Sequence, residues 1–387
     1  MDFKISQRLN DLPPYLFLEI DKAKRRARAE GRDIIDLGVG DPDQPTPKHI
    51  IEKLYEAAGD PANHHYALDQ GLLKLRQAIA GWYKRRFNVG LNPETEVLPL
   101  IGSKEGIAHL PLAFSNAGDY SLIPDPCYPP YKGGTILAGG RPYLMPLKEE
   151  NSFLPDLKKI PLNIRKKARL IYVNYPNNPT SAVCNKNFYK ELLEFARKHK
   201  IIIASDLAYS EMAYDGFKPM SILEADGAKD VAIEFHSLSK TYNMTGWRIG
   251  WACGNAKLIA GLAKVKSNID SGIFTPIQIA GIAALEGPQD FISQMCGIYQ
   301  QRRDVLANGL RSLGWQVNPP KATFYVWVRI PTGTDSIKFA GHILGKTNIV
   351  VTPGIGFGKH GEGYIRFALT QPQERIKEAV SRLKLIF

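Results

Sequence analysis

The stretch that decides the fold reads VAIEFHSLSKTY at residues 231–242 and is followed by TGWRIG at residues 245–250. Its first five residues are apolar apart from Glu234 and predict a strand, which ends where hydroxyl side chains surround Lys240. A lysine amine forms a Schiff base with a carbonyl compound once desolvation or nearby cations remove its proton. The hydroxyls and Arg248 would suit a phosphate group. The stretch therefore favours covalent capture of a phosphorylated aldehyde, with a surface lysine in a polar loop as the alternative.

The composition indicates an enzyme-sized globular chain. It has 387 residues, of which 44% are hydrophobic and 23% charged, enough for one large domain and a smaller one. Residues 1–8 contain no secretory signal, and no apolar run approaches the roughly 20 residues that a membrane-spanning helix needs. The four cysteines, at positions 127, 184, 253 and 296, never stand at the spacing of a metal or redox site. We expect a cytoplasmic protein with no membrane partner.

The formal net charge of +12 raises the question of a nucleic-acid partner. The basic residues mostly alternate with apolar ones in helical patterns, as at residues 22–28. Such patterns favour solvated helix faces over a nucleic-acid-binding surface, so we expect no nucleic-acid partner. The positive field would instead attract acidic small molecules.

Helical and strand patterns alternate along most of the chain. Continuous apolar runs that end in turn residues, with helical patterns between them, occupy residues 96–102, 120–124, 168–173 and 201–206. Strands buried on both faces have this pattern, so the sequence predicts an α/β fold with a doubly wound, mostly parallel sheet.

The last hundred residues have a different pattern. A long helical segment at 288–313 precedes strand patterns at 323–328, 349–352 and 364–369. This order is typical of a compact α+β unit. We expect a large α/β domain at residues 48–287 and a smaller α+β domain that combines residues 1–47 with residues 288–387.

Four predicted strands end in residues that can bind a ligand, because ligands bind beyond the carboxyl ends of the strands in doubly wound sheets. GSKEG at 102–106 opens a helix, so Ser103, Lys104 and the backbone N–H groups could hold a phosphate, with an ordinary helix cap as the alternative. The two prolines of NYPNNPT at 174–180 would leave Asn178 as a rigid amide donor, or simply form a turn.

Asp206 follows five nearly apolar residues at the end of another of these strands, and Tyr209 lies three positions further on. A carboxylate buried at such a position is strongly destabilising unless a cation matches its charge. A protonated pyridine nitrogen would match it. The alternative is a pair with a structural arginine.

In this order, NNPT, SDLAY and SLSK followed by GWRIG resemble the motifs of the fold-type I pyridoxal-phosphate aminotransferases, aminotransferase class I/II, over essentially the full chain. The resemblance implies that Lys240 carries pyridoxal 5′-phosphate and then moves the proton between substrate and cofactor. It implies that Asp206 keeps the ring nitrogen protonated, and that Asn178 and Tyr209 hydrogen-bond the ring oxygen. The implied catalytic residues are Lys240, Asp206 and Tyr209, and the implied phosphate ligands are Ser103, Lys104, Ser237, Ser239 and Arg248.

The same resemblance implies roles for residues outside these motifs. Tyr128 in PCYPPY would stack on the cofactor ring, and Arg366 would hold the substrate α-carboxylate in a bidentate fork, with Gly40 and Asn178 also contacting substrate. Tyr66 in HYALDQG would reach the phosphate of the other subunit's site, which implies a homodimer with shared active sites.

The chain departs from the family pattern at one position. Ser181 stands where Asn-Pro-Thr-Gly is usual. The loss of the glycine would alter the turn but leave the side chain of Asn178 in place.

Residues 13–21, 67–71 and 179–181 look like the LL-diaminopimelate aminotransferase branch, in which Tyr15 would contact substrate. This branch implies reversible, ping-pong amino transfer between LL-2,6-diaminopimelate, or its keto product tetrahydrodipicolinate, and the glutamate/2-oxoglutarate pair, within lysine biosynthesis. Aspartate, aromatic and alanine aminotransferases share the core motifs and are the alternatives. A pyridoxal-phosphate β-lyase of the cystathionine type is another alternative.

The sequence favours two other classes of function less. Gly356, Gly358 and Gly361 form a Gly-x-Gly-x-x-Gly pattern, but a strand pattern follows it where a nicotinamide-binding site needs a helix. A regulator or binding module could share the fold. The amine, the carboxylate and the carboxylate-binding arginine of an active site together favour an enzyme. No metal-binding motif occurs, so no metal is expected.

Overall fold

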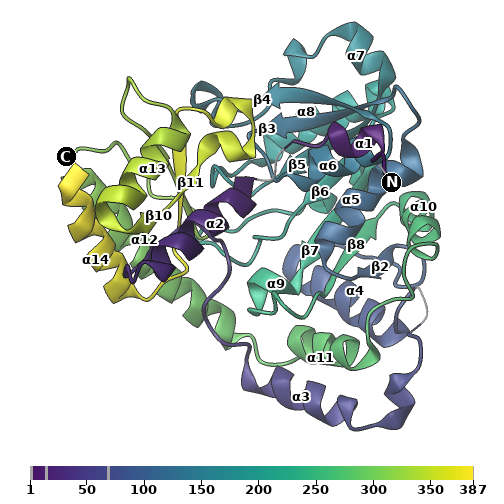
Figure 1. Ribbon diagram of the computed structural model, residues 1–387. Coiled ribbons are helices and arrows are strands. Elements are labelled where there is room, and N and C mark those ends of the chain that lie inside the picture. The colour runs from purple at the N-terminus through teal and green to yellow at the C-terminus, as the bar shows by residue number, and fades with distance from the viewer. Residues whose placement is uncertain (1–2, 14–15, 68–69, 387) are drawn as a thin grey trace.

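The structure is a computed structural model that describes residues 3–13, 16–67 and 70–386. A seven-stranded sheet forms the core of its larger part (Figure 1). Its strands are β2 (Val97–Leu100), β3 (Tyr120–Asp125), β4 (Arg141–Pro146), β5 (Ala168–Asn174), β6 (Ile202–Asp206), β7 (Ala232–Ser237) and β8 (Gly250–Gly254). They lie in the order β2-β8-β7-β6-β5-β3-β4. Strands β3 to β7 pair in parallel, and β8 is antiparallel to both of its neighbours. The predicted fold class is confirmed.

Two strands of this sheet were not predicted, for physical reasons. Strand β4 is a half-exposed edge strand that contains two prolines, so it lacks the continuous apolar run of a buried strand. Strand β8 is buried, but it is short and begins and ends with glycine, a residue that is depleted in strands.

Helices cover both faces of the large sheet. They are α3 (Lys48–Ala58), α4 (Leu73–Phe87), α5 (Ser103–Phe114), α6 (Pro130–Leu137), α7 (Leu162–Lys167), α8 (Lys186–His199), α9 (Leu238–Thr241), α10 (Ala256–Lys266) and α11 (Thr275–Glu286). Alternate residues of β5 pack on opposite faces. Leu170 and Tyr172 join the apolar cluster of α5, α6 and α10, whereas Ile171 and Val173 join the cluster of α4, α8 and α11. This double burial explains why the strands read as continuous apolar runs.

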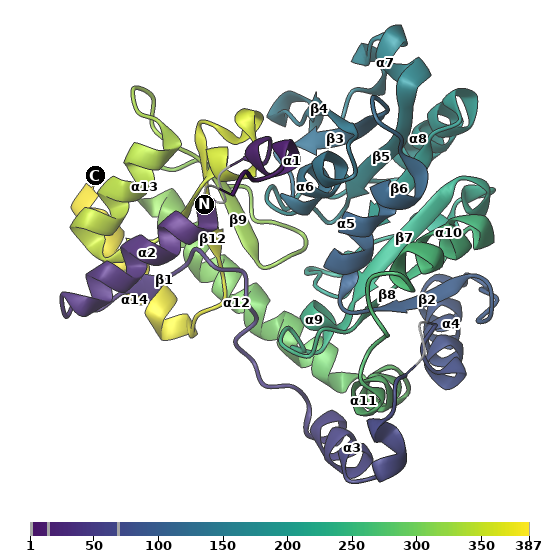
Figure 2. The same ribbon diagram turned by 45° about the vertical axis from the view of Figure 1, so that its right-hand side comes forward.

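A smaller unit is built on two short sheets. Strand β1 (Ile35–Asp36) pairs in parallel with β10 (Ile349–Val350), and β11 (Thr352–Pro353), β12 (Tyr364–Ala368) and β9 (Tyr325–Arg329) form an antiparallel sheet. Figures 1 and 2 together show these strands among α2 (Leu16–Ala29), α12 (Asp290–Ser312), α13 (Ser336–Thr347) and α14 (Gln373–Leu383). We call this set of elements the small unit. The glycine pattern at 356–361 forms 3₁₀ turns between β11 and β12, not a turn from a strand into a helix.

The pairing of β1 with β10 brings the N-terminal segment into the small unit, although α1 (Gln7–Asn10) lies beside α6 of the large-sheet unit (Figures 1 and 2). The domain limits of 48–287, and of 1–47 with 288–387, stay a prediction. None of the described helices combines the length and the apolar character that crossing a membrane would require.

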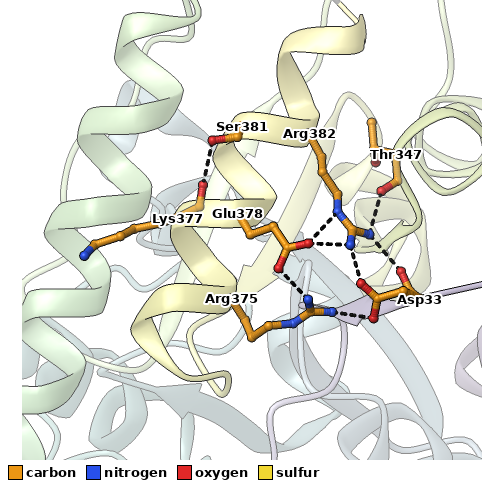
Figure 3. Close-up of polar contacts among 7 residues, drawn as sticks. All are labelled: Asp33, Thr347, Arg375, Lys377, Glu378, Ser381 and Arg382. Carbon is orange, nitrogen blue, oxygen red and sulfur yellow. Dashed lines mark hydrogen bonds and ion pairs between the residues drawn. The ribbon is translucent and has the colours of Figure 1, made fainter.

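Two carboxylates with different degrees of burial fix the N-terminal segment through ion pairs with arginines. The buried guanidinium of Arg302 on α12 donates to both carboxylate oxygens of Asp43, at 2.7 and 2.8 Å, and the Tyr299 hydroxyl donates to the same carboxylate at 3.0 Å. Asp33, at the surface, contacts Arg375 and Arg382 of α14 (Figure 3). Both carboxyls have a lowered pKa: burial of Asp43 opposes the shift and Arg302 outweighs it, whereas Arg375 and Arg382 lower the pKa of Asp33.

We expect Asp43→Asn to destabilise the protein far more than Asp33→Asn. Removing the Asp43 charge leaves Arg302 buried without its partner, at a cost of about 2 to 3 kcal/mol after discounting for the partial exposure of Asp43. Because the fold lowers the pKa of Asp43, the stabilisation by the Asp43–Arg302 ion pair is present at pH 7. It is lost as the pH falls below 3.8, the ordinary pKa of an aspartate.

Thermal unfolding of the two variants at pH 7 and at acid pH checks this expectation. Equal melting temperatures for Asp43→Asn and Asp33→Asn at pH 7 would contradict it.

Candidate active site

A cavity of about 310 Å³ lies at the carboxyl ends of the parallel strands, where segment 39–41 and Tyr325 of the small unit reach the large sheet. It brings together most of the site residues predicted from the sequence. Those that line it are Gly40, Ser103, Lys104, Tyr128, Asn178, Asp206, Tyr209, Ser237, Ser239, Lys240 and Arg248.

Lys240 enters the cavity from α9, the short helix that follows β7. The Ser237 hydroxyl caps this helix by accepting a hydrogen bond from the backbone N–H of Ser239 at 3.1 Å. The Lys240 amine donates to the carbonyl oxygen of Gly40 at 3.0 Å. Burial lowers the pKa of Lys240 to about 8; the carboxylate of Asp41 opposes this shift, and Arg366 and Arg248 reinforce it. The amine is therefore more nucleophilic near neutral pH than an exposed lysine.

Asp206 is buried at the end of β6, and burial raises its pKa to about 6. Its carboxylate accepts hydrogen bonds from the Tyr131 hydroxyl at 2.7 Å and from the backbone N–H of Ala208 at 3.3 Å. Both donors are neutral. Among the described residues no arginine pairs with Asp206, as the alternative of a structural ion pair would require. A buried carboxylate with neutral donors that also borders a cavity suits a cationic N–H on a bound ring.

The N-termini of α5 and α9 and the turn before β8 surround one end of the cavity with donors. Gly102 has a φ of +75°, and a Cβ there would collide with the guanidinium of Arg248. Arg248, itself at a φ of +55°, donates to the carbonyl oxygen of Thr245 at 2.8 Å. Hydroxyls, Lys104 and this guanidinium form a set of donors suited to a phosphate, and a Cβ at Gly102 would displace the guanidinium from it.

Arg366 is buried beside the cavity on β12 and is 2% exposed. Its guanidinium lies 4.0 Å from the ring centroid of Tyr325 and 4.6 Å from that of Phe357. It donates to Oδ1 of Asn178 and to the carbonyl oxygen of Gly38, each at 2.8 Å. In the described part of the chain Nε has no hydrogen-bond partner. A guanidinium has five N–H donors, so donors remain for a carboxylate ligand.

Asn178 is held by residues that the sequence analysis did not single out. Its backbone N–H donates to Oδ1 of Asn174 at 2.8 Å, and the amide of Asn174 donates to the carbonyl oxygen of Asp206 at 2.8 Å. The Tyr209 hydroxyl meets the Tyr325 hydroxyl at 3.1 Å. Asp41, Asn174, Thr245 and Tyr325 line the cavity, and Tyr131 supports Asp206 from behind.

Of the predicted site residues that the structure describes, Tyr66 and Arg366 are absent from the lining of the cavity. Tyr66 is 85% exposed and does not line it. Tyr15 lies outside the described residues. Of the residues that were missed, Asp41 follows the predicted residue Gly40 and Asn174 opens the NYPNNPT segment, so the sequence offered a usable signal for both. Tyr325 stands inside a strand pattern, and nothing local distinguishes it from a core residue.

These features define a class of protein. A lysine with a lowered pKa just after a strand, a buried carboxylate, a cluster of donors suited to a phosphate and a buried arginine with free N–H donors are arranged at and beside one cavity of a doubly wound sheet. A family model described as aminotransferase class I and II matches residues 32–383, and the chain belongs to this family.

Curated relatives include the LL-diaminopimelate aminotransferase of Moorella thermoacetica, 53% identical over 381 residues that cover 98% of each protein. That of Halothermothrix orenii is 55% identical over 98% of this chain and 97% of the relative. Similar solved structures include substrate-bound BacF from Bacillus subtilis, with a TM-score of 0.96 and 39% identity over 100% of this chain and 98% of that one. A Thermus thermophilus aspartate aminotransferase mutant has a TM-score of 0.93 and 28% identity over 100% of each chain.

The protein is therefore a pyridoxal-phosphate-dependent aminotransferase that uses an amino acid and a 2-oxo acid. The cavity fits this cofactor in three respects. The cluster of donors suits its phosphate, the uncompensated Asp206 suits its protonated ring nitrogen, and the amine of Lys240 suits its aldehyde.

We expect the cofactor-free protein to react with pyridoxal phosphate at a rate that rises with pH through a midpoint near 8. The neutral amine is the nucleophile, and the pKa of Lys240 is lowered to about 8 from an ordinary value of 10.5. Stopped-flow absorbance of the bound cofactor measures the rate, and borohydride reduction followed by peptide mapping identifies the modified lysine. Lys240→Ala is the control. A midpoint above 10, or a label on another lysine, would refute the assignment.

Proposed function

We propose that this aminotransferase moves an amino group between LL-2,6-diaminopimelate, or its keto product tetrahydrodipicolinate, and the glutamate/2-oxoglutarate pair. One observation carries the proposal: curated LL-diaminopimelate aminotransferases match 98% of the chain at 53 to 55% identity. The geometry of the cavity supports the reaction class, and the relatives support the substrate. A place in lysine biosynthesis follows from that substrate.

We propose that Lys240 holds the cofactor and transfers the substrate proton. Pyridoxal phosphate supplies an electron sink for the electron pair that remains on the substrate Cα when its proton is removed. A lysine amine with a pKa of about 8 can accept that proton and return it near neutral pH. The hydrogen bond from Lys240 to Gly40 holds the amine on the side of the cavity that the small unit closes.

Four further side chains would orient the cofactor ring. Asp206 would pair with the ring N–H, Asn178 and Tyr209 would donate to the ring oxygen, and Tyr128 would stack on the ring face. The buried support that Tyr131 gives Asp206 favours this role, because it fixes the carboxylate without neutralising it. Ser103, Lys104, Ser237, Ser239 and Arg248 would bind the phosphate.

Arg366 would hold the substrate α-carboxylate, with Gly40 providing a backbone contact. The two aromatic rings and two hydrogen bonds that fix the guanidinium favour a bidentate fork, since its direction is set before substrate arrives. Every amino acid carries this carboxylate, so Arg366 cannot select the substrate. Selection would come from residues around the distal group, for which Tyr15 and the neighbourhood of residues 66–70 are the candidates from the sequence.

We expect LL-diaminopimelate to exceed aspartate, alanine and aromatic amino acids as donor to 2-oxoglutarate by at least about a hundredfold in kcat/KM. A site built for a distal ammonium and carboxylate rejects analogues that lack them, because its own buried polar groups are left unpaired. A donor panel with glutamate formation as readout measures this ratio. Release of pyruvate and ammonia from cystathionine would favour the β-lyase alternative. A panel led by aspartate, alanine or an aromatic amino acid would overturn the substrate.

We also propose a homodimer in which Tyr66 completes the partner's site. In the single chain Tyr66 does not line its own cavity and is 85% exposed. Other exposed apolar side chains occur on α3 and on the segment before α11, and a groove of about 860 Å³ lies between α3, α4 and α11. A monomer has little reason to expose such a set. The exposed apolar residues are Ile51, Tyr55, Tyr66, Leu73, Ile269 and Phe274.

We expect mixed dimers of two inactive chains to regain activity. In a dimer of Lys240→Ala with Tyr66→Ala, one site receives Lys240 from one chain and Tyr66 from the other, and the second site receives neither. Statistical subunit exchange would restore about a quarter of the wild-type activity. Activity after refolding the two chains together, with subunit exchange verified by differently tagged chains, tests this. An inactive, fully exchanged mixture would count against shared sites.

We further propose a cytoplasmic location, which four unpaired cysteines favour.

A further inference from the structure

Two buried hydroxyl residues, one in each unit, adopt a backbone conformation that favours glycine. The φ of Ser181 is +58° and that of Thr323 is +67°. Both side chains are buried. The left-handed region is unfavourable for residues with a Cβ and most of all for a β-branched threonine. Such strain persists only where the surrounding contacts hold it, and it is concentrated at functional sites.

Only one assignment of donors and acceptors fits the hydrogen bonds of Ser181 and Thr323. The Ser181 hydroxyl donates to the carbonyl oxygen of Tyr325 at 2.8 Å and also meets the Thr323 hydroxyl at 2.7 Å. Since a hydroxyl has one hydrogen, Thr323 must donate to Ser181. The Thr323 oxygen in turn accepts the backbone N–H of Tyr325 at 3.1 Å. The two hydroxyls thus bind both polar groups of the Tyr325 main chain in a closed ring.

The side chain of Tyr325 contacts two groups of the active site. Its ring lies 4.0 Å from the guanidinium of Arg366, and its hydroxyl meets that of Tyr209 at 3.1 Å. Its hydroxyl also lies so close to Gly40 that a Cβ there would collide with it. If Tyr209 donates its one hydrogen to the cofactor ring oxygen, Tyr325 is the donor of the bond between the two hydroxyls.

We propose that Tyr325 is a positioning residue of the amino-transfer site and that the hydroxyls of Ser181 and Thr323 fix its main chain. The ring of Tyr325 orients Arg366 for the substrate carboxylate, and its hydroxyl strengthens Tyr209 as a donor to the cofactor. Ser181 then replaces the family's usual glycine because its hydroxyl joins the turn of Asn178 to the strand of Tyr325. This inference rests on the roles that the proposed function gives to Arg366 and Tyr209.

Two measurements distinguish the role of the Tyr325 ring from the role of its hydroxyl. The first is the Kd of 2-oxoglutarate for the pyridoxal form, with which this acid cannot react because it has no amino group. We expect Tyr325→Leu to weaken binding about tenfold and Tyr325→Phe to change it less than about twofold. The second is the pH midpoint of the cofactor's visible absorption, which Tyr325→Phe should move upward, because a weaker hydrogen bond to the ring oxygen leaves the bound cofactor more basic.

The hydroxyl pair is tested with Ser181→Gly, which relieves the left-handed strain and so preserves folding. Loss of one hydrogen bond to the Tyr325 carbonyl should weaken 2-oxoglutarate binding about threefold to tenfold without lowering the melting temperature. Ser181→Ala, which lacks the hydroxyl but keeps the strain, should weaken binding equally and lower the melting temperature relative to Ser181→Gly.

An Arg366→Lys variant distinguishes the two proposals. If Arg366→Lys binds 2-oxoglutarate as wild type does, the carboxylate assignment of the proposed function fails. If Arg366→Lys loses affinity while folded Tyr325→Leu and Ser181→Gly do not, the positioning role alone is overturned. An unchanged absorption midpoint in Tyr325→Phe would overturn the role of its hydroxyl even if Tyr325→Leu failed to fold.

Discussion

The desolvation of one amine is the constraint on which the rest of the site depends. Lys240 stands on α9, just after β7, where burial lowers its pKa to about 8, and the charges of Arg366 and Arg248 act in the same direction. An ammonium in water would remain protonated and unreactive at neutral pH. To remove water from this amine, the protein must close the cavity with segment 39–41 and Tyr325 of the small unit, since the large sheet alone leaves the strand ends open.

Closing the cavity in this way buries several charges that must then be matched. Asp206 receives only neutral donors, whereas Arg366 is fixed by two rings, an amide oxygen and a backbone carbonyl. Both groups can still bind a ligand, because the carboxylate lacks a counter-charge and the guanidinium keeps free N–H donors. Under the proposed function, an anionic, ring-protonated cofactor and a carboxylate substrate would supply the missing partners, so the groups that are costly to bury would favour these ligands.

Contacts between the two units also decide which side chains are rigid. Asn178 belongs to a turn of the large-sheet unit, yet its amide oxygen binds Arg366 of the small unit, and Ser181 of the same turn binds Thr323 and Tyr325. The anchoring of Asp43 by Arg302 holds the neighbouring segment 39–41 in place from α12. Polar groups in a desolvated region have few alternative partners, so such networks give a single arrangement where apolar packing would allow several.

The sequence by itself determined the parts of this protein that are encoded locally. Continuous apolar runs gave the buried strands, and the residues that follow those strands, such as Ser103, Asn178, Asp206 and Lys240, were predictable as site residues because parallel strands deliver their carboxyl ends to one edge. The tertiary structure decided the rest. Tyr131 beneath Asp206, Tyr325 between Arg366 and Tyr209, and the bond of Ser181 to Thr323 join residues far apart in the chain, and no local pattern distinguishes them from core or turn residues. Edge strand β4 and glycine-bounded β8 likewise owe their pairing to neighbouring strands, because their own residues carry too weak a preference to specify it.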